Sequence, residues 1–135
     1  MALFVWKNEY SVKVQSIDKE HQRIFEMINE LHEAMRVGQG SKVAPAILER
    51  LLDYTREHFA YEESLMQKAK YPDLGAHRIE HVKLTTAVSK MKQDFDKGNT
   101  AISLTLADFL KDWLKAHIAA RDQKYTEYLV AAGIN

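Results

Sequence analysis

The sequence predicts an all-α protein, an up-down-up-down four-helix bundle with an extended N-terminal arm. Three observations support this fold class. Apolar residues recur in alternating steps of three and four, the spacing of one helix face. The two prolines and five glycines fall near the expected joints. Four such segments of about 20–30 residues, joined by short connections, are typical of a helix bundle.

The first 17 residues are expected to form the arm, and residues 18–135 the bundle, as a single domain. Apolar and polar residues alternate in part of the arm, which favours an extended chain. The apolar residues are Leu3, Val5, Val12 and Val14. Trp6 is the expected anchor of the arm on the bundle.

The first helix is expected to begin at Asp18, a good N-cap, and to stop at Gly38, where positive φ costs little. Its stripe contains His21, Ile24, Ile28, Leu31 and Met35. Ser41 is the expected cap of the second helix, which tolerates Pro45 in its first turn and runs to about Lys68. Its stripe contains Leu48, Leu51, Tyr54, Thr55, His58, Phe59, Glu62, Leu65 and Met66.

The third helix follows Pro72, because the residue before a proline resists helical geometry. Asp73 offers its cap, and it is expected to reach Lys97 and end at Gly98. Its stripe contains His77, His81, Leu84, Val88, Met91 and Phe95.

The fourth helix is expected to begin at residues 99–100 and to continue to about Val130. Its stripe contains Leu106, Phe109, Leu110, Trp113, Leu114, His117 and Ile118. It therefore supplies the last core face of the bundle.

Composition excludes several classes of function. Lys+Arg and Asp+Glu both number 19, and a chain without net charge has no electrostatic reason to bind nucleic acid or acidic lipid. The absence of cysteine excludes disulfides, thiolate metal sites and cysteine nucleophiles. No basic, apolar leader and no 18-residue apolar stretch occurs, so we expect no membrane insertion and a cytoplasmic location.

The histidines lie at unexpected positions. Five of the six fall on the core stripes, namely His21, His58, His77, His81 and His117. A buried imidazole or carboxylate without a partner is costly. Residues four apart lie within about 40° on a helix, so His58 with Glu62, and His77 with His81, can each present two ligands to one point. This pattern predicts a metal site inside the bundle.

Asp122 is a further candidate ligand, five residues after His117. An ideal helix would separate the two by about 140°. If Asp122 is a ligand, the helix is expected to loosen locally, and a π-bulge is the usual device.

Each candidate also has an ordinary interpretation. A lone core histidine is usually a hydrogen-bonded core residue. Glu62 can pair with Arg56 or Lys68, and Asp122 can be solvated within a charged stretch. The contribution of ligand-type residues by all four helices to one inner face favours metal. His32 has no partner at helical spacing and is expected to be structural or solvated.

The number of ligands indicates two metal ions. Five imidazoles and two carboxylates are too many for one tetrahedral or octahedral ion. Two octahedral ions offer twelve positions. Imidazoles fill five, two bridging carboxylates four and a bridging oxygen two, which leaves one position open. This count assumes that both carboxylates bridge.

The candidate ligands also match a known pattern in order and spacing. The matching motifs are His21, His58-x-x-x-Glu62-Glu63-x-Leu65-Met66, Tyr71-Pro72, His77-x-x-x-His81 and His117-x-x-x-x-Asp122. Over nearly all its length the chain resembles the hemerythrin family, in the form of a single-domain bacteriohemerythrin. The resemblance implies an oxo- or hydroxo-bridged pair of iron ions without haem. It implies one iron on His77, His81 and His117 and the other on His21 and His58, bridged by Glu62 and Asp122.

The resemblance also implies reversible dioxygen binding for transport or storage, with O2 held as hydroperoxide at the open position of the second iron. Nitric oxide and small anions are further expected ligands of that position. No catalytic residue and no enzymatic activity are expected, and the recipient of the oxygen is unknown. Four residues one turn from ligands are expected to wall a dry oxygen pocket, a role compatible with ordinary core packing. They are Ile24, Phe25, Trp113 and Leu114.

Four other interpretations remain open. The chain can be a di-iron oxidase or peroxidase that consumes O2 or peroxide. It can be a sensing module, although no output domain accompanies it. Zinc or manganese can replace iron, because imidazole suits several metals. Iron storage or detoxification is the fourth.

Overall fold

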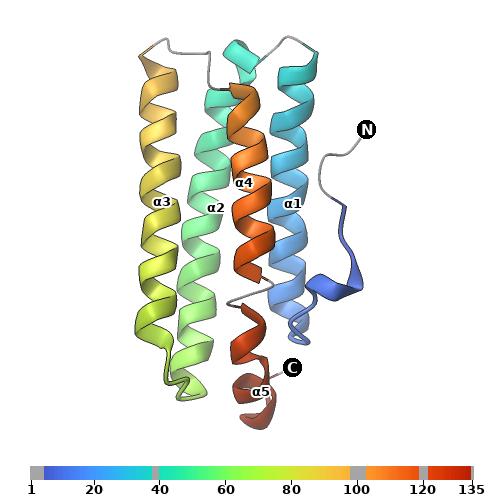
Figure 1. Ribbon diagram of the computed structural model, residues 1–135, viewed down its shortest axis with the longest axis vertical. Helices are drawn as coiled ribbons and strands as arrows, with labels where there is room; N and C mark the ends of the chain where they lie inside the picture. Colours follow the sequence, from blue (N-terminus) through green and yellow to red (C-terminus); the bar gives the residue numbers. More distant parts are fainter. Residues whose placement is uncertain (1–4, 38–39, 98–102, 119–121, 135) are drawn as a thin grey trace.

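Four long helices run alternately up and down, side by side, in the computed structural model (Figure 1), which describes residues 5–37, 40–97, 103–118 and 122–134. The predicted fold class is therefore confirmed, and no strand occurs in these ranges. Helix α1 packs against α2 and α4, and α2 packs against α3. The elements are the 3₁₀ helix η1 (Asn8–Tyr10), α1 (Gln15–Arg36), α2 (Gly40–Lys68), α3 (Leu74–Asp96), α4 (Ser103–His117) and α5 (Gln123–Ala131).

The start of α1 differs from the prediction. The helix begins at Gln15, with Val14 as its N-cap, so the assignment of Asp18 as the cap is wrong. The Asp18 carboxylate instead accepts hydrogen bonds from Ser11 Oγ at 2.6 Å and from the Val12 backbone N–H at 2.9 Å. A carboxylate in the first helical turn thus fastens the arm rather than its own helix.

The start of α2 also differs. Because the helix begins at Gly40, Ser41 lies inside it and Pro45 is its sixth residue, beyond the first turn. Proline there removes one backbone hydrogen bond of the helix. Helix α3 begins directly after Asp73, as predicted, and ends at Asp96. The predicted ends at Gly38 and Gly98, the predicted start at 99–100 and the arm residue Leu3 lie outside the described residues.

The core consists of two apolar clusters along the bundle axis. The larger cluster contains Ile24, Ile28 and Leu31 of α1, with partners from α2, α3 and α4. The smaller cluster contains Val12, Val14, Ile17, Leu65, Met66, Tyr71, Tyr125 and Leu129. Along α1 the buried residues pass from Ile17 through His21 to Ile24, so a polar layer separates the two clusters.

The arm contacts both clusters. Trp6 is half-buried, and its ring centroid lies 5.9 Å from that of Tyr10 and 5.4 Å from that of Phe25, in agreement with its predicted role as an anchor. Val12 and Val14 are buried in the smaller cluster. The arm runs beside α1 before entering it (Figure 1).

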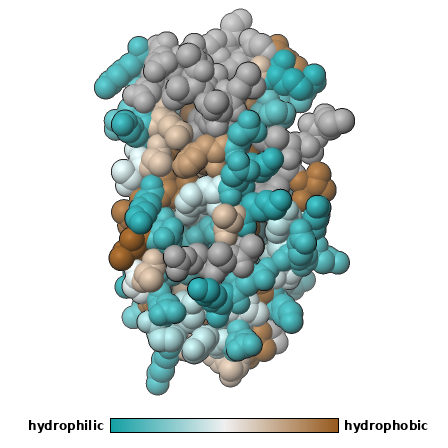
Figure 2. All heavy atoms as spheres, viewed as in Figure 1, coloured by the Kyte–Doolittle hydropathy of each residue, from teal (hydrophilic) through white to brown (hydrophobic). Residues whose placement is uncertain are grey.

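Hydrophilic side chains predominate on the face that Figure 2 shows, as expected for helices that bury one stripe each. Among the described helices, none combines the length and the apolar character needed to cross a membrane.

Candidate metal centre

All seven candidate ligands lie in the interior, in the layer between the two clusters. None is more than 5% exposed, although each carries a polar side chain. His21 comes from α1, and α2 and α3 contribute two ligands each. By contrast His32, also on α1, is half-buried and lies outside the layer.

The fourth helix brings its two ligands together by losing its regular geometry. His117 ends α4, Asp122 directly precedes α5, and the flanking described residues Ile118 and Asp122 are π-helical. The π-helical geometry agrees with the prediction and brings His117 Nε2 to 3.0 Å from Asp122 Oδ1.

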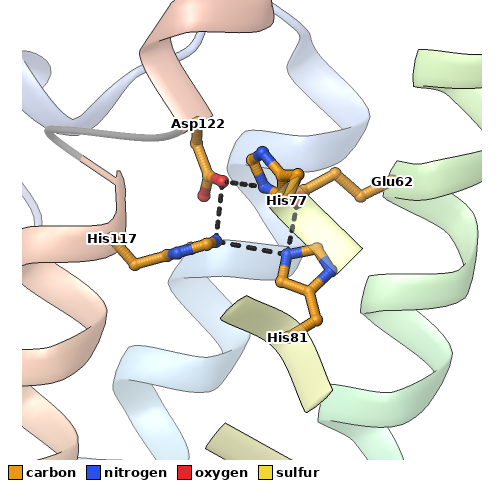
Figure 3. A group of neighbouring side chains, drawn as sticks. All are labelled: Glu62, His77, His81, His117 and Asp122. Atoms are coloured by element: carbon orange, nitrogen blue, oxygen red, sulfur yellow. Dashed lines mark hydrogen bonds and ion pairs between the residues drawn. The ribbon is translucent and has the colours of Figure 1, made fainter. Parts of the chain in front are cut away.

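Side chains from different helices point toward one another in this layer (Figure 3). Their ligand atoms form two groups within the described part of the chain, each with all atoms within 4.8 Å of one another. The first group comprises Glu62, His77, His81, His117 and Asp122, and the second comprises His21, His58 and Glu62.

Glu62 faces both groups with different oxygens. Its Oε1 lies 3.1 Å from Nε2 of His77 and 3.1 Å from Nε2 of His81. Its Oε2 lies 3.4 Å from Nε2 of His21 and 3.2 Å from Nε2 of His58. The carboxylate thus spans the space between three histidines on one side and two on the other.

Asp122 also directs its two oxygens to different histidines, from the far side of the layer. Its Oδ1 lies 2.8 Å from Nε2 of His77 and 3.0 Å from Nε2 of His117, and its Oδ2 lies 3.3 Å from Nε2 of His21. The two alternatives in which these carboxylates serve ordinary purposes are therefore wrong. Glu62 faces imidazoles rather than Arg56 or Lys68, and Asp122 is 1% exposed rather than solvated.

The buried nitrogens and oxygens of the site are better placed to bind a metal than to hydrogen-bond with one another. His21 Nε2 and both Asp122 oxygens are buried and close to other polar atoms, yet none is aligned for a hydrogen bond. His81 Nε2 and His117 Nε2 lie 3.2 Å apart. Buried polar atoms are nearly always hydrogen-bonded, so the unpartnered nitrogen of His21 and the two unpartnered oxygens of Asp122 fit a cation bound between them. Imidazole nitrogens with carboxylate oxygens suit iron, zinc or manganese.

In the metal-free protein, protons bound to the histidines neutralise the negative charge of Glu62 and Asp122. Burial lowers the pKa of His21, but its contacts with Asp122 and Glu62 outweigh burial and raise the pKa to about 9. The same opposing effects raise the pKa of His77 to about 9. Burial raises the pKa of Glu62, but the neighbouring His58, His21 and His77 hold it well below its usual range. The site thus favours positive charge between its carboxylates.

Sequence reasoning assigned no role at the site to four residues that contact the ligands. The buried Tyr125 hydroxyl donates to Glu62 Oε2 at 2.9 Å, and the Phe59 ring stacks on that of His81 at 3.7 Å. Glu20 and Glu63 accept hydrogen bonds from Nδ1 of two imidazoles. Tyr125 lies three residues beyond Asp122, and this spacing could have revealed it. Glu20 and Glu63 adjoin predicted ligands, but a glutamate beside a buried face gives no signal that distinguishes it from a solvated one.

The predicted oxygen-pocket residues divide into two pairs. Ile24 and Leu114 line an apolar cavity of about 20 Å³, together with Phe59 and other residues of α1 to α4. Phe25 and Trp113 are not among its lining residues. Phe25 packs on the arm, and the Trp113 ring stacks on that of His117 at 4.5 Å.

Comparison with known proteins matches this architecture. The model of the hemerythrin HHE cation binding domain matches residues 12–129. Bacteriohemerythrin of Stenotrophomonas maltophilia (strain R551-3) is 37% identical over 97% of this chain and 84% of its own. Bacteriohemerythrin of Methylococcus capsulatus (strain Bath) is 36% identical over 97% of this chain and 100% of its own. A wild-type hemerythrin crystal structure superposes with a TM-score of 0.89 at 34% identity, covering 95% of this chain and 98% of that chain.

Proposed function

The chain belongs to the hemerythrin family, and from this premise we propose that its seven buried ligands hold two iron ions at which dioxygen binds reversibly. One iron would take His77, His81 and His117, and the other His21 and His58. The observation that carries the proposal is the division of each carboxylate, since Glu62 and Asp122 each direct one oxygen to each group. Carboxylates placed in this way can bridge two ions.

The two histidine groups differ in size, which would leave the open position on the iron of His21 and His58. When bound, the ferrous ions would supply the two electrons that dioxygen takes up and returns. The chain itself orients the ligands. Tyr125 donates to Glu62 Oε2, which fixes that carboxylate, and the Phe59 ring lies against His81.

The surrounding residues would keep the site dry. Ile24 lies one turn from His21 and Leu114 one turn before His117, and both line the apolar cavity beside the site. Trp113 and Phe25 remain part of the proposed pocket wall although neither lines this cavity: Trp113 stacks on His117, whereas Phe25 packs on Trp6 of the arm. Excluding water and protons limits side reactions of bound oxygen and favours its release unchanged.

We propose that the chain carries or stores dioxygen rather than acting as an enzyme. Anionic ligands favour high-valent, oxidising iron, and in this site five neutral imidazoles outnumber two carboxylates. Nitric oxide and small anions would compete with dioxygen for the open position. A cytoplasmic location is likewise a proposal, which cell fractionation would test. We also propose that the chain is a single domain with an arm of residues 1–17 on a bundle of residues 18–135, although helix α1 already begins at Gln15.

The decisive experiment combines metal analysis with absorption spectroscopy. The reduced, anaerobic protein is measured, exposed to air and then deoxygenated. We expect two irons per chain and an absorption band that appears with oxygen and disappears on its removal. Far fewer than two irons would contradict the site, and steady oxygen consumption with a reductant would indicate an oxidase or peroxidase instead.

A further inference from the structure

Two of the five ligand imidazoles have carboxylate partners on their outer nitrogen. His58 Nδ1 lies 2.7 Å from Glu20 Oε1, and His81 Nδ1 lies 2.8 Å from Glu63 Oε2. In contrast, the Nδ1 atoms of His21 and His117 are buried without a hydrogen-bond partner in the described part of the chain. Each of the two ligand groups therefore contains one imidazole with such a partner.

An ionised carboxylate can only accept a hydrogen bond, which fixes the proton of each ring. Nδ1–H of His58 and of His81 donates outward, so each Nε2 presents its lone pair to the centre of the layer. His58 Nε2 lies 3.2 Å from Glu62 Oε2, so this nitrogen faces the centre of the layer, and its lone pair is available to a metal when the ring is neutral. A carboxylate behind an imidazole also increases the electron donation of the ring to a metal.

The two carboxylates differ in how they are held. Arg78 Nε donates to Glu63 Oε1 at 3.0 Å, so Glu63 is fixed at both oxygens, by His81 and by Arg78. The side chain of Arg78 is 51% exposed and that of Glu63 is 21% exposed. A continuous chain of contacts thus runs from solvent to the three-histidine group. Glu20 has His58 as its partner.

We propose that Glu20 and Glu63 are positioning residues, one for each metal, and that Arg78 acts on the three-histidine group through Glu63. The inference rests on the proposed function, because it requires metal at both groups. It predicts that each glutamate affects its own group, and that Arg78 has no effect once Glu63 is changed.

The test measures cobalt(II) binding to the metal-free protein by its visible absorption. Glu63→Gln and Glu20→Gln keep the shape of the side chain and remove its charge. Each should weaken binding at one group by about 10–100-fold, the usual effect of such outer partners. Glu57→Gln is the matched control, since Glu57 is an exposed glutamate of α2 beside His58. Arg78→Gln should weaken binding less than Glu63→Gln, and the double variant should equal Glu63→Gln alone.

A second readout identifies the ring concerned. In zinc-loaded, ¹⁵N-histidine-labelled protein, Glu63→Gln should shift the Nδ1–H resonance of His81 and leave that of His58 in place, and Glu20→Gln should do the reverse. Should Glu63→Gln fail to fold, Arg78→Gln still tests the relay, because Arg78 touches no ligand.

Three results would overturn the inference: cobalt affinities equal to that of Glu57→Gln, unshifted resonances, or an Arg78 effect that adds to that of Glu63→Gln. If they occur in a protein whose wild type binds two metals and oxygenates reversibly, the inference alone fails. If the wild type binds fewer than two metals, the proposed function fails as well.

Discussion

The metal-free protein should lose stability as the pH rises, and this dependence tests the electrostatics of the site. The pKa values of His21 and His77 are raised to about 9 in the folded protein, against 6.5 for an ordinary histidine. A raised pKa means that the folded state binds the proton more tightly than the unfolded state. The resulting stabilisation is fully present below pH 6.5 and is lost as the pH rises through about 9.

The magnitude follows from the size of the shift. At about 1.4 kcal/mol per pKa unit, a rise from 6.5 to about 9 corresponds to about 3 kcal/mol for one histidine. His21 and His77 contact the same two carboxylates, so their joint effect is smaller than twice this value. Domains of this size are stable by roughly 5–15 kcal/mol, so the loss is a large fraction of the total.

At low pH the stability of the metal-free protein is limited by the two buried carboxylates. The pKa values of Glu62 and Asp122 are held below their ordinary values by the neighbouring histidines, against the effect of burial. Their contribution is present above the ordinary carboxyl pKa and is lost as the pH falls through the lower, folded values. The metal-free protein should therefore be most stable between about pH 5 and 6.5.

Urea unfolding followed by circular dichroism, with a chelator present, measures the free energy of unfolding between pH 5 and 10. The metal-loaded protein is the control, because metal occupies the nitrogens that would otherwise bind protons, so its stability should not fall over this interval. A metal-free protein with constant or rising stability between pH 6.5 and 9 would refute the reasoning.

Three substitutions test other contacts. Leu114→Ala enlarges the apolar cavity and should lower the free energy of unfolding by roughly 2–5 kcal/mol and accelerate autoxidation; an unchanged autoxidation rate would exclude Leu114 from the oxygen pocket. Tyr125→Phe removes the donor to Glu62 Oε2 and should destabilise the metal-free protein by about 1.5–3 kcal/mol in urea unfolding, whereas a neutral result would show that the bond contributes nothing. Asp18→Ala removes the acceptor of Ser11 Oγ and the Val12 N–H and should cost about 1–3 kcal/mol and speed proteolysis of the arm; unchanged cleavage would show that the arm is held elsewhere.

The helices and the burial of the candidate ligands were largely predictable because both depend on spacing along one element. A stripe with steps of three and four fixes which side of a helix is buried, and the five histidines and Glu62 on those stripes are all found in the interior. The π-helical geometry beside Asp122 followed from the same reasoning, since five residues do not fit one helix face.

Contacts between different helices, or between the arm and a helix, were harder to predict from the sequence. Aspartate is a preferred N-cap residue, so the sequence suggests that Asp18 caps its own helix. Only the path of the arm shows that its carboxylate binds Ser11 and Val12 instead. Likewise Glu63 and Arg78 lie on different helices, and their pairing depends on how α2 and α3 are rotated against each other. Local preference describes one helix, whereas these bonds arise from packing.

The position of the polar layer explains why the arm belongs to the site. Asp122 lies where the fourth helix leaves regular geometry, and such a segment holds its direction only if its neighbours fix it. Helix α5, which follows, is nine residues long, and it buries Tyr125 and Leu129 against Val12 and Val14 of the arm. Gln123 Nε2 also donates to the Glu9 carbonyl at 2.6 Å. Because the arm and α5 close the layer on this side, the orientation of Asp122 and the exclusion of water also depend on residues outside the set of seven, such as Val12, Val14 and Leu129.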